Sequence, residues 1–131
     1  MTANALTIKN GRAGGGLIIL SDYVAAALTT GTKKKQWVCP VNGYIEQVVV
    51  HNGAAGSGGT SDIIDVNKAG TTIFTTQGRR PTQLSGDTLA YTVGEIEVTQ
   101  VQAGDIISYD VDQVCSTGST ENIIQIRIRP R

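Results

Sequence analysis

The sequence has few of the side chains that enzymes use for catalysis. Its 131 residues include one histidine, two cysteines and 5% aromatic residues, and charged residues make up 17% where about 25% is usual. The single histidine, His51, ends an apolar run, and the chain has no Gly-x-Ser-x-Gly motif. Nucleophilic catalysis needs a nucleophile, a base and a group that orients the base. We therefore predict no enzymatic activity and no catalytic residue, and we interpret His51 as a surface or strand-edge residue.

Two glycine-rich runs lack the residues that would make them nucleotide-binding motifs. The runs are GRAGGG at 11–16 and GAAGSGGT at 53–60. Neither has the lysine that precedes Ser or Thr in a phosphate-binding loop. The dinucleotide fingerprint also requires a strand-helix-strand unit, which the sequence pattern does not provide. We expect no cofactor.

The charge balance and the short apolar runs limit the possible partners. Eleven Lys and Arg residues balance eleven Asp and Glu residues, so the chain has none of the basic excess that direct nucleic-acid binding requires. The longest apolar runs, at 16–20 and 23–28, fall short of the roughly 20 residues of a membrane span. Residues 1–12 do not resemble a secretory signal. We expect no membrane partner and no export, and zero net charge weakly favours self-association.

The two cysteines are predicted to be reduced and buried. Cys39 and Cys115 lie far apart in a chain without an export signal, where thiols normally stay reduced. A disulfide formed later, outside the cell, remains an alternative. A zinc site would need more Cys or His ligands than the sequence supplies.

The chain is rich in the residues of short strands and turns. It contains 16 glycines and many Thr, Val and Ile residues, and apolar alternation recurs every 8 to 12 residues or so. This spacing predicts an all-β domain over residues 17–131, an antiparallel β-sandwich or barrel of about six to eight strands. Residues 1–16 are predicted to be a flexible N-terminal arm.

Individual strands are predicted from their alternating side chains. The final strand places Ile124, Ile126 and Ile128 inward, and an earlier strand places Ile107, Tyr109 and Val111 inward. Further strands are expected at 44–51 and 95–101, the latter with Ile96 and Val98 inward, and a flexible loop at 53–59. The segment 17–30 fits a short helix or an extended segment, and we favour the extended form.

The clearest local pattern is a hairpin over residues 61–76. Its first strand places Ile64 and Val66 on one face, and Lys68-Ala69-Gly70 completes the turn. The return strand, TTIFTT, is predicted to place Phe74 on one side and Ile73 on the other.

Four carboxylates and several basic residues are candidate binding groups. Asp110 and Asp112 share a strand face, and with Asp65 and Glu97 they offer oxygen ligands for calcium or a glycosidase pair. We interpret them instead as a solvated polar face and predict no metal. The basic residues are either solubilising charges or partner contacts, since Arg pairs well with carboxylates. The contact set comprises Lys9, Arg12, Lys33, Lys34, Lys35, Arg79 and Arg80, with Arg80 expected at a hairpin tip.

Part of the sequence resembles a domain of tailed-bacteriophage virion proteins. The string DVNKAGTTIFTTQGRRPT at 65–82 precedes VTQVQAGDIISYDVDQV at 98–114 and an alternating final strand. This order is similar to that of head decoration (cement) proteins, head fibres and some tail-associated proteins. The resemblance covers roughly residues 41–129. It implies a jelly-roll sandwich and contributes no catalytic residues.

The resemblance also implies a function. Decoration proteins of this kind form homotrimers on the outer surface of the phage head and clamp neighbouring major capsid subunits, after synthesis in the host cytoplasm. The expected partners are therefore the major capsid protein and further copies of this chain. The alternatives are a head-fibre or tail-associated module that recognises host-surface glycan, a tail-tube or neck component and, last, an enzyme.

Overall fold

The computed structural model describes residues 16–87 and 91–131, and their regular structure is almost entirely β. The N-terminal arm expected at 1–16 lies outside these ranges except for Gly16. The strands are β2 (Ile18–Val24), β3 (Gly31–Val38), β4 (Gly43–Ala54), β5 (Asp62–Lys68), β6 (Thr71–Thr72), β7 (Thr82–Gln83), β8 (Tyr91–Val93), β9 (Gln100–Val101), β10 (Ile106–Gln113) and β11 (Thr120–Pro130), and one short 3-10 helix is η2 (Gln77–Arg79).

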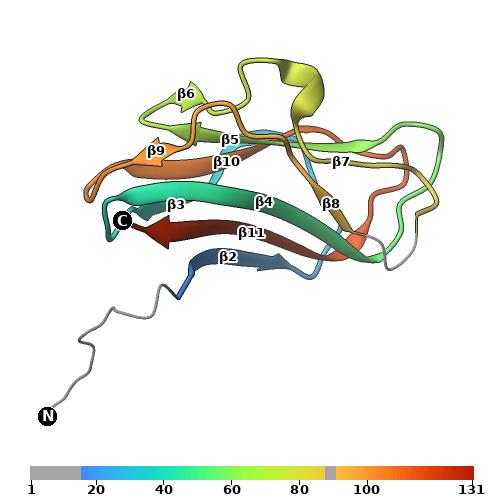
Figure 1. The fold of residues 1–131 in the computed structure, drawn as a ribbon. Coiled ribbons are helices and arrows are strands. Elements are labelled where there is room, and N and C mark those ends of the chain that lie inside the picture. The colour runs from blue at the N-terminus through green and yellow to red at the C-terminus, as the bar shows by residue number, and fades with distance from the viewer. Residues whose placement is uncertain (1–15, 88–90) are drawn as a thin grey trace, which may run out of the picture.

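The strands form two antiparallel sheets that pack face to face, as Figure 1 shows. One sheet has the order β3-β10-β5-β6 with β7 also beside β5, and the other has the order β2-β11-β4-β8 with β9 also beside β4. β2 pairs with β11, β3 pairs with β10, and β4 and β5 pair with the short strands β6 to β9, which lie between β5 and β10 in the chain. Strands from the two ends of the described chain therefore pair with each other, and successive pairs lie in alternate sheets, which is the topology of a jelly roll. The predicted all-β, jelly-roll-like sandwich is confirmed.

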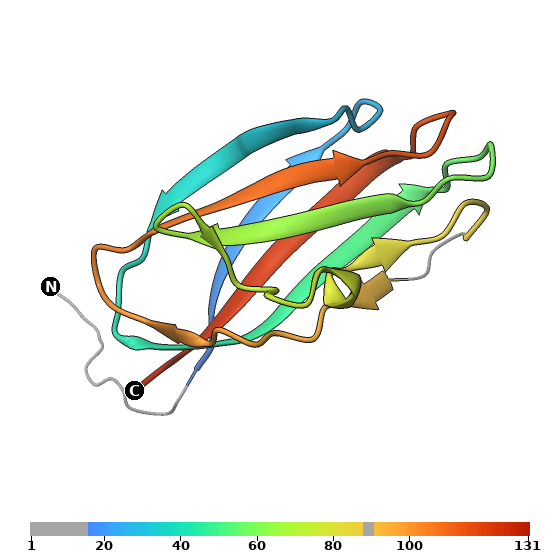
Figure 2. The ribbon, with the colours of Figure 1, turned by 90° about the horizontal axis from the view of Figure 1, so that it is seen from above.

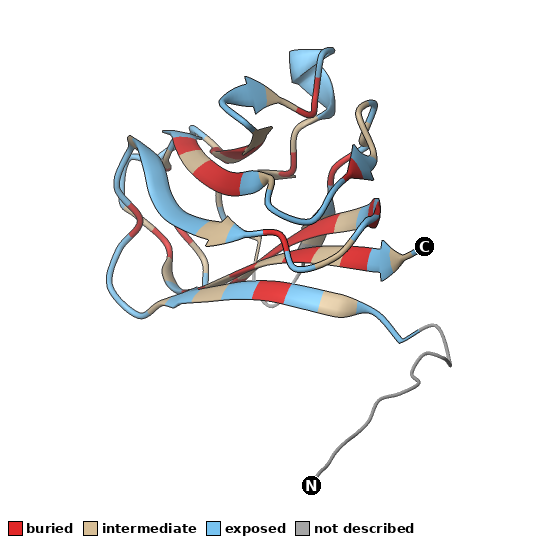
Figure 3. Cartoon of the chain, turned by 90° about the vertical axis from the view of Figure 1, so that its left-hand side faces the viewer, coloured by how far each residue is buried: buried red, intermediate tan, exposed pale blue. Residues whose placement is uncertain are grey.

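The core lies between the sheets and follows the alternation of the strands. Ile124, Ile126 and Ile128 have no exposed surface, and Ile107, Tyr109 and Val111 face them from β10, as predicted. Figure 3 shows the resulting bands of buried and exposed positions along single strands. Seen from above, in Figure 2, the long strands of the two sheets cross obliquely, as twisted sheets do.

Segment 17–30 is extended, as predicted. β2 pairs along its whole length with β11, and its residue Leu20 points into the core and is buried. The three alanines that follow do not form a helix, because Leu28 is drawn into the core and its N–H bonds the Ser119 carbonyl (3.1 Å). Packing therefore overrides the helix preference of alanine.

The hairpin turn is confirmed, but its return strand is shorter than predicted. Ala69 and Gly70 have φ of 50° and 84°, as a two-residue turn between twisted strands requires. After Thr72 the chain leaves the sheet, and Ile73 and Phe74 both lie in the core instead of on opposite faces. Thr72 causes this departure because its hydroxyl accepts the N–H of Phe74 (3.0 Å), so that residue needs no strand partner.

The strand predicted at 95–101 is also mostly absent. Ile96 and Val98 do pack against the core, but the strand is confined to β9. Glu97 explains the difference: its carboxylate accepts the N–H and the hydroxyl of Thr76 (2.6 and 2.9 Å), and its own N–H bonds the Ile73 carbonyl (3.1 Å). The Thr76 N–H is the main reason that the pKa of Glu97 is lowered. The segment is therefore tied to the turn after β6 and forms no ladder.

A buried carboxylate joins the loops at one end of the sandwich. Asp62 has no exposed surface and accepts hydrogen bonds from Asn52 Nδ2 (3.0 Å), Ser119 Oγ (2.6 Å) and the N–H of Cys115 (2.9 Å). The 53–59 loop is anchored here rather than free, because Ser57 pairs with Thr117 and β4 continues past its predicted end to Ala54.

Both cysteines are free and buried, as predicted. Burial, reinforced by the charge of Asp62, raises the pKa of the Cys115 thiol. Gly56 packs directly on this side chain: a Cβ at that position would lie 2.6 Å from the Cβ of Cys115. Cys115 therefore acts as a small packing residue.

Candidate binding surface

The three consecutive lysines of β3 do not form one patch. All three are exposed, but alternation along the strand sends their side chains in different directions. The Lys34 ammonium donates to Thr29 Oγ1 (2.9 Å), whereas Lys35 reaches across the open side of the sandwich to Asp22 (3.5 Å). Lys33 has a left-handed backbone (φ 49°) at an irregular point of the β3–β10 pairing. Lysines and irregular pairing on an edge strand discourage further strand addition.

Arg79 and Arg80 lie in and just after η2, not at the tip of the hairpin as predicted. The tip is Ala69-Gly70. The Arg80 guanidinium is largely covered and contacts Asp112 Oδ2 through Nη1 (2.6 Å). Arg79 is more exposed and lies 3.8 to 3.9 Å from two glutamates, Glu95 and Glu97. Lys9 and Arg12 fall outside the described residues.

Three of the four predicted carboxylates, Asp65, Asp110 and Asp112, belong to the outer face of the β3-β10-β5-β6 sheet, called here the β10 face, whereas Glu97 lies in the irregular segment before β9. Asp110 accepts the N–H of Lys33 (2.8 Å) and Asn67 Nδ2 (3.0 Å), and Asp112 pairs with Arg80. Asp65 lies opposite Asp110 in the ladder. Each carboxylate is therefore matched by a donor of its own chain. Within residues 16–87 and 91–131, no three His, Cys, Asp or Glu side chains are placed to hold a metal ion.

Asp65 is the most buried carboxylate of the β10 face. Its Oδ1 accepts the Thr72 hydroxyl (2.6 Å) and the N–H of Val66 (2.8 Å), and 6% of the residue is exposed. Burial raises the pKa of Asp65 and outweighs these hydrogen bonds, and the charge of Asp112 raises it further. The polar groups of this face therefore already have partners, although the face also exposes Val38 and Ile106 (64% and 41%), which lie opposite each other in the ladder.

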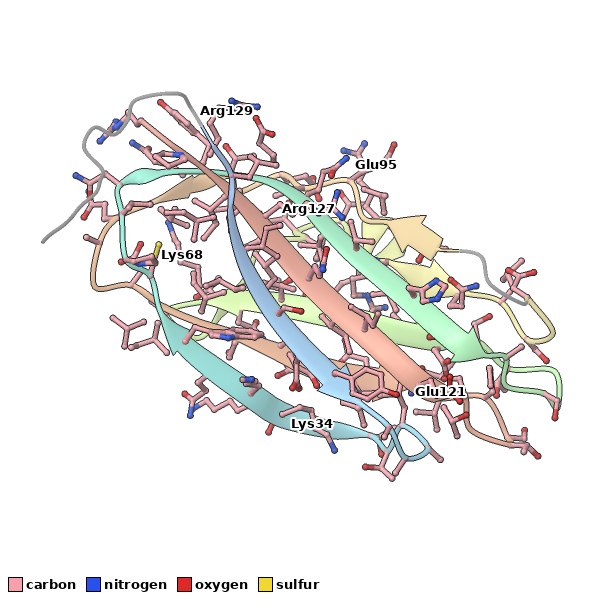
Figure 4. All side chains as sticks on the ribbon, turned by 90° about the horizontal axis from the view of Figure 1, so that it is seen from below. Lys34, Lys68, Glu95, Glu121, Arg127 and Arg129 are labelled. Carbon is pink, nitrogen blue, oxygen red and sulfur yellow. The ribbon has the colours of Figure 1, made fainter. Side chains whose placement is uncertain are left out.

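The outer face of the other sheet, called here the β11 face, has a different character. Residues directly opposite in a ladder share a face, so the register assembles three rows across β2, β11 and β4. The rows, extended to β8 by Val93 beside Val49, are Tyr23-Ile123-His51, Ser21-Gln125-Val49-Val93 and Ile19-Arg127-Gln47. Figure 4 looks onto this face. The sequence predicted several strands of this sheet but not their register, so the β11 face was not predicted.

Large apolar side chains of the β11 face remain exposed. Ile19, Tyr23 and Val93 are exposed by 49%, 58% and 43%. Ile19 and Tyr23 lie on β2 at one edge of the sheet and Val93 lies on β8 at the other. Exposed apolar groups that gather on one face of a small domain are typical of an interaction surface. The face also carries Arg127, which Figure 4 places near its middle.

A shallow hollow lies at the centre of the β11 face. Its lining consists of Val49, His51, Ile123, Gln125 and Arg127. His51 is half-buried within β4 rather than at a strand end, since β4 continues for three residues beyond it. The lining contains no carboxylate, hydroxyl or thiol, so His51 meets no nucleophile and no orienting acid here. The hollow is suited to binding an anionic or hydrogen-bonding group.

A second polar cluster closes the open side of the sandwich between β2 and β3. The Tyr109 hydroxyl donates to Asp22 Oδ2 (2.7 Å), and Lys35 pairs with the same carboxylate. Burial, with a contribution from Asp22, raises the pKa of Tyr109 well above its usual value. Lys35 also lies over the Trp37 ring, 5.7 Å from its centre. This cluster joins the two sheets.

Comparisons with known proteins identify no family. No protein-family model matches the chain, and no curated protein is significantly similar to it. In the described part of the chain, no helix is long and apolar enough to span a membrane.

Proposed function

We propose that this chain is a decoration (cement) protein of a tailed-bacteriophage head. In this proposal it is made in the host cytoplasm, binds the outer surface of the head and stabilises contacts between major capsid subunits. The jelly-roll topology agrees with the expectation drawn from residues 65–82 and 98–114. The β11 face is the observation that carries the proposal, because it exposes Ile19 and Tyr23 on β2 at one edge and Val93 on β8 at the other, which leaves apolar surface available for a protein partner.

We also propose that the protein acts as a homotrimer. A closed three-fold ring needs two different, complementary patches on each copy. The zero net charge gives no overall repulsion between copies. Binding to three capsid subunits at once would raise the overall affinity through effective concentration.

Sedimentation with heads tests the proposal directly. Purified protein is sized by sedimentation velocity and then mixed with emptied heads that lack it. We expect a trimer that co-sediments with the heads and makes them more resistant to heating. Absence of co-sedimentation would refute the proposal, and binding to a glycan array without affinity for heads would favour the head-fibre or tail-associated alternative.

A further inference from the structure

Arg127 is held rigidly on the β11 face without being neutralised. Its Nε and Nη2 donate to Gln125 Oε1 (3.3 and 2.9 Å), and its Nη1 donates to Gln47 Oε1 (2.9 Å). Both acceptors are neutral amides. Among the residues that the structure describes, no carboxylate lies within ion-pair distance of this guanidinium.

Three other arginines form ion pairs and in this respect differ from Arg127. Arg79 faces Glu95 and Glu97, Arg80 contacts Asp112, and Arg129, two residues along the same strand, pairs with Glu46. These arginines find a carboxylate within their own chain. The positive charge of Arg127 therefore remains available to a partner.

The geometry of the guanidinium indicates what that partner would carry. Arginine has five N–H donors, of which Gln125 and Gln47 occupy three. Two donors are left, one on each terminal nitrogen. A carboxylate accepts two parallel hydrogen bonds from such a fork, and this pairing is stronger than bonds between neutral groups.

The surroundings favour a protein over a sugar. Val49 and Ile123 line the hollow beside Arg127, and Ile19 and Val93 extend the apolar surface on either side. Beside the guanidinium, these aliphatic side chains offer no flat ring for a sugar to stack on, because the exposed ring of Tyr23 lies two rows away along the strands. They are suited to apolar side chains that would exclude water around a central ion pair and strengthen it.

We propose that the β11 face is a docking surface for a protein that presents an Asp or Glu carboxylate to Arg127, flanked by apolar side chains. That protein is the major capsid subunit at the outer surface of the head, an identity that rests on the proposed function. Gln47 and Gln125 are positioning residues, because they hold the guanidinium without competing for its charge.

The test compares Arg127→Gln with Arg129→Gln. Both variants lose one positive charge from the exposed side of β11, but only the first removes the available fork. Binding to emptied heads is measured by co-sedimentation, after thermal unfolding has shown that both variants fold. We expect Arg127→Gln to weaken binding about tenfold or more and Arg129→Gln less than about threefold, with Arg127→Lys in between because lysine keeps the charge and loses the fork.

Each outcome of this test decides a separate point. Equal binding by wild type and Arg127→Gln overturns the docking surface while leaving the capsid function in place. Equal loss in both glutamine variants attributes binding to total charge and also overturns it. Failure of the wild type to bind heads refutes the capsid function and, with it, this assignment. If wild-type protein is oligomeric and Arg127→Gln dissociates it, the occupant is a second copy and the assignment to the capsid is wrong.

Discussion

The two outer faces of the sandwich satisfy their polar groups in opposite ways. On the β10 face, Asp65, Asp110 and Asp112 each bond a donor of their own chain. On the β11 face, Arg127 is held by amides alone and large apolar side chains remain exposed. The two faces therefore differ in their charged groups, because the carboxylates of the β10 face have partners within the chain and the Arg127 guanidinium has no carboxylate partner among the described residues; both faces expose apolar side chains, which are Val38 and Ile106 on the β10 face.

The segment between β6 and β7 explains why the carboxylates of the β10 face have partners within the chain. Thr72, at its start, bonds Asp65 on β5, and Arg80, near its end, bonds Asp112 on β10. Figure 1 shows this segment, with η2, above the upper sheet, while no described segment lies below β2, β11 and β4. The segment between β6 and β7 therefore supplies hydrogen-bond and ion-pair partners to the carboxylates of the β10 face and, among the residues that the structure describes, none to the β11 face.

Truncating Phe74, the buried side chain that holds the segment between β6 and β7 in the core, should have the largest effect on stability. Phe74 is fully buried, and Phe74→Ala should lower the free energy of unfolding by about 3–5 kcal/mol. Hydrogen exchange should also accelerate in residues 72–83, so that the β10 face loses its internal partners. Val93→Ala on the β11 face is the control, with an expected change below about 0.5 kcal/mol. Similar losses in denaturant titrations of both variants would mean that the faces do not differ in this way.

Removing the Thr72 hydroxyl should have the next largest effect. Thr72→Ala deprives the buried Asp65 of a donor and the Phe74 N–H of its acceptor. We expect a loss of about 1–3 kcal/mol, because buried polar groups left without partners are costly. Ser21→Ala, an exposed hydroxyl of the β11 face, should be neutral in the same urea titration. A neutral Thr72→Ala would contradict the role given to this side chain.

Paired arginine variants compare the faces directly. Arg80→Gln breaks a largely covered ion pair and should cost about 1 kcal/mol. Arg127→Gln should change stability by less than about 0.5 kcal/mol, since no carboxylate depends on it. Chemical denaturation of both variants measures the difference. The reverse order would show that Arg127 serves folding rather than binding.

The smallest effect concerns pH. Burial raises the pKa of Asp65 in the folded protein, so between the unfolded and folded pKa values the native state holds a proton that the unfolded state has lost. Stability contributed by this group is therefore full below the unfolded pKa and falls as pH rises through the folded pKa. Asp65→Asn should remove this decline and gain a few tenths of a kcal/mol near neutral pH. Urea titrations from about pH 4 to pH 7 would show it, and parallel curves for variant and wild type would refute it.

The sequence predicted the strands whose alternation is set by burial. Ile124, Ile126 and Ile128 form such a pattern, because a shift of one residue would expose all three. The pattern did not predict where a side-chain hydrogen bond ends a strand. At Thr72 and Glu97, single side chains redirect the backbone, and an alternating pattern carries no information about them.

The candidate surface was harder to predict because it depends on register between distant strands. The alternation that places Ile126 and Ile128 inward also places Arg127 outward, but nothing in the neighbouring sequence identifies Ile19 and Gln47 as the residues beside it. The lysines of β3 show the opposite case. They are consecutive in sequence and suggest one basic patch, but the strand directs Lys34 to Thr29 and Lys35 to Asp22. Composition and spacing therefore predict the architecture better than they predict surface chemistry.

The nesting of the strands has a practical consequence. Ile18 of β2 lies opposite Ile128 of β11, so β2 begins and β11 ends at the same end of the sandwich. A short glycine linker from Arg131 to Gly16 should thus yield a circular permutant, with its new ends opened at Gly58-Gly59. Cargo genetically attached beside Gly16 or Arg131 would emerge at this end of the sandwich, away from the loops gathered around Asp62.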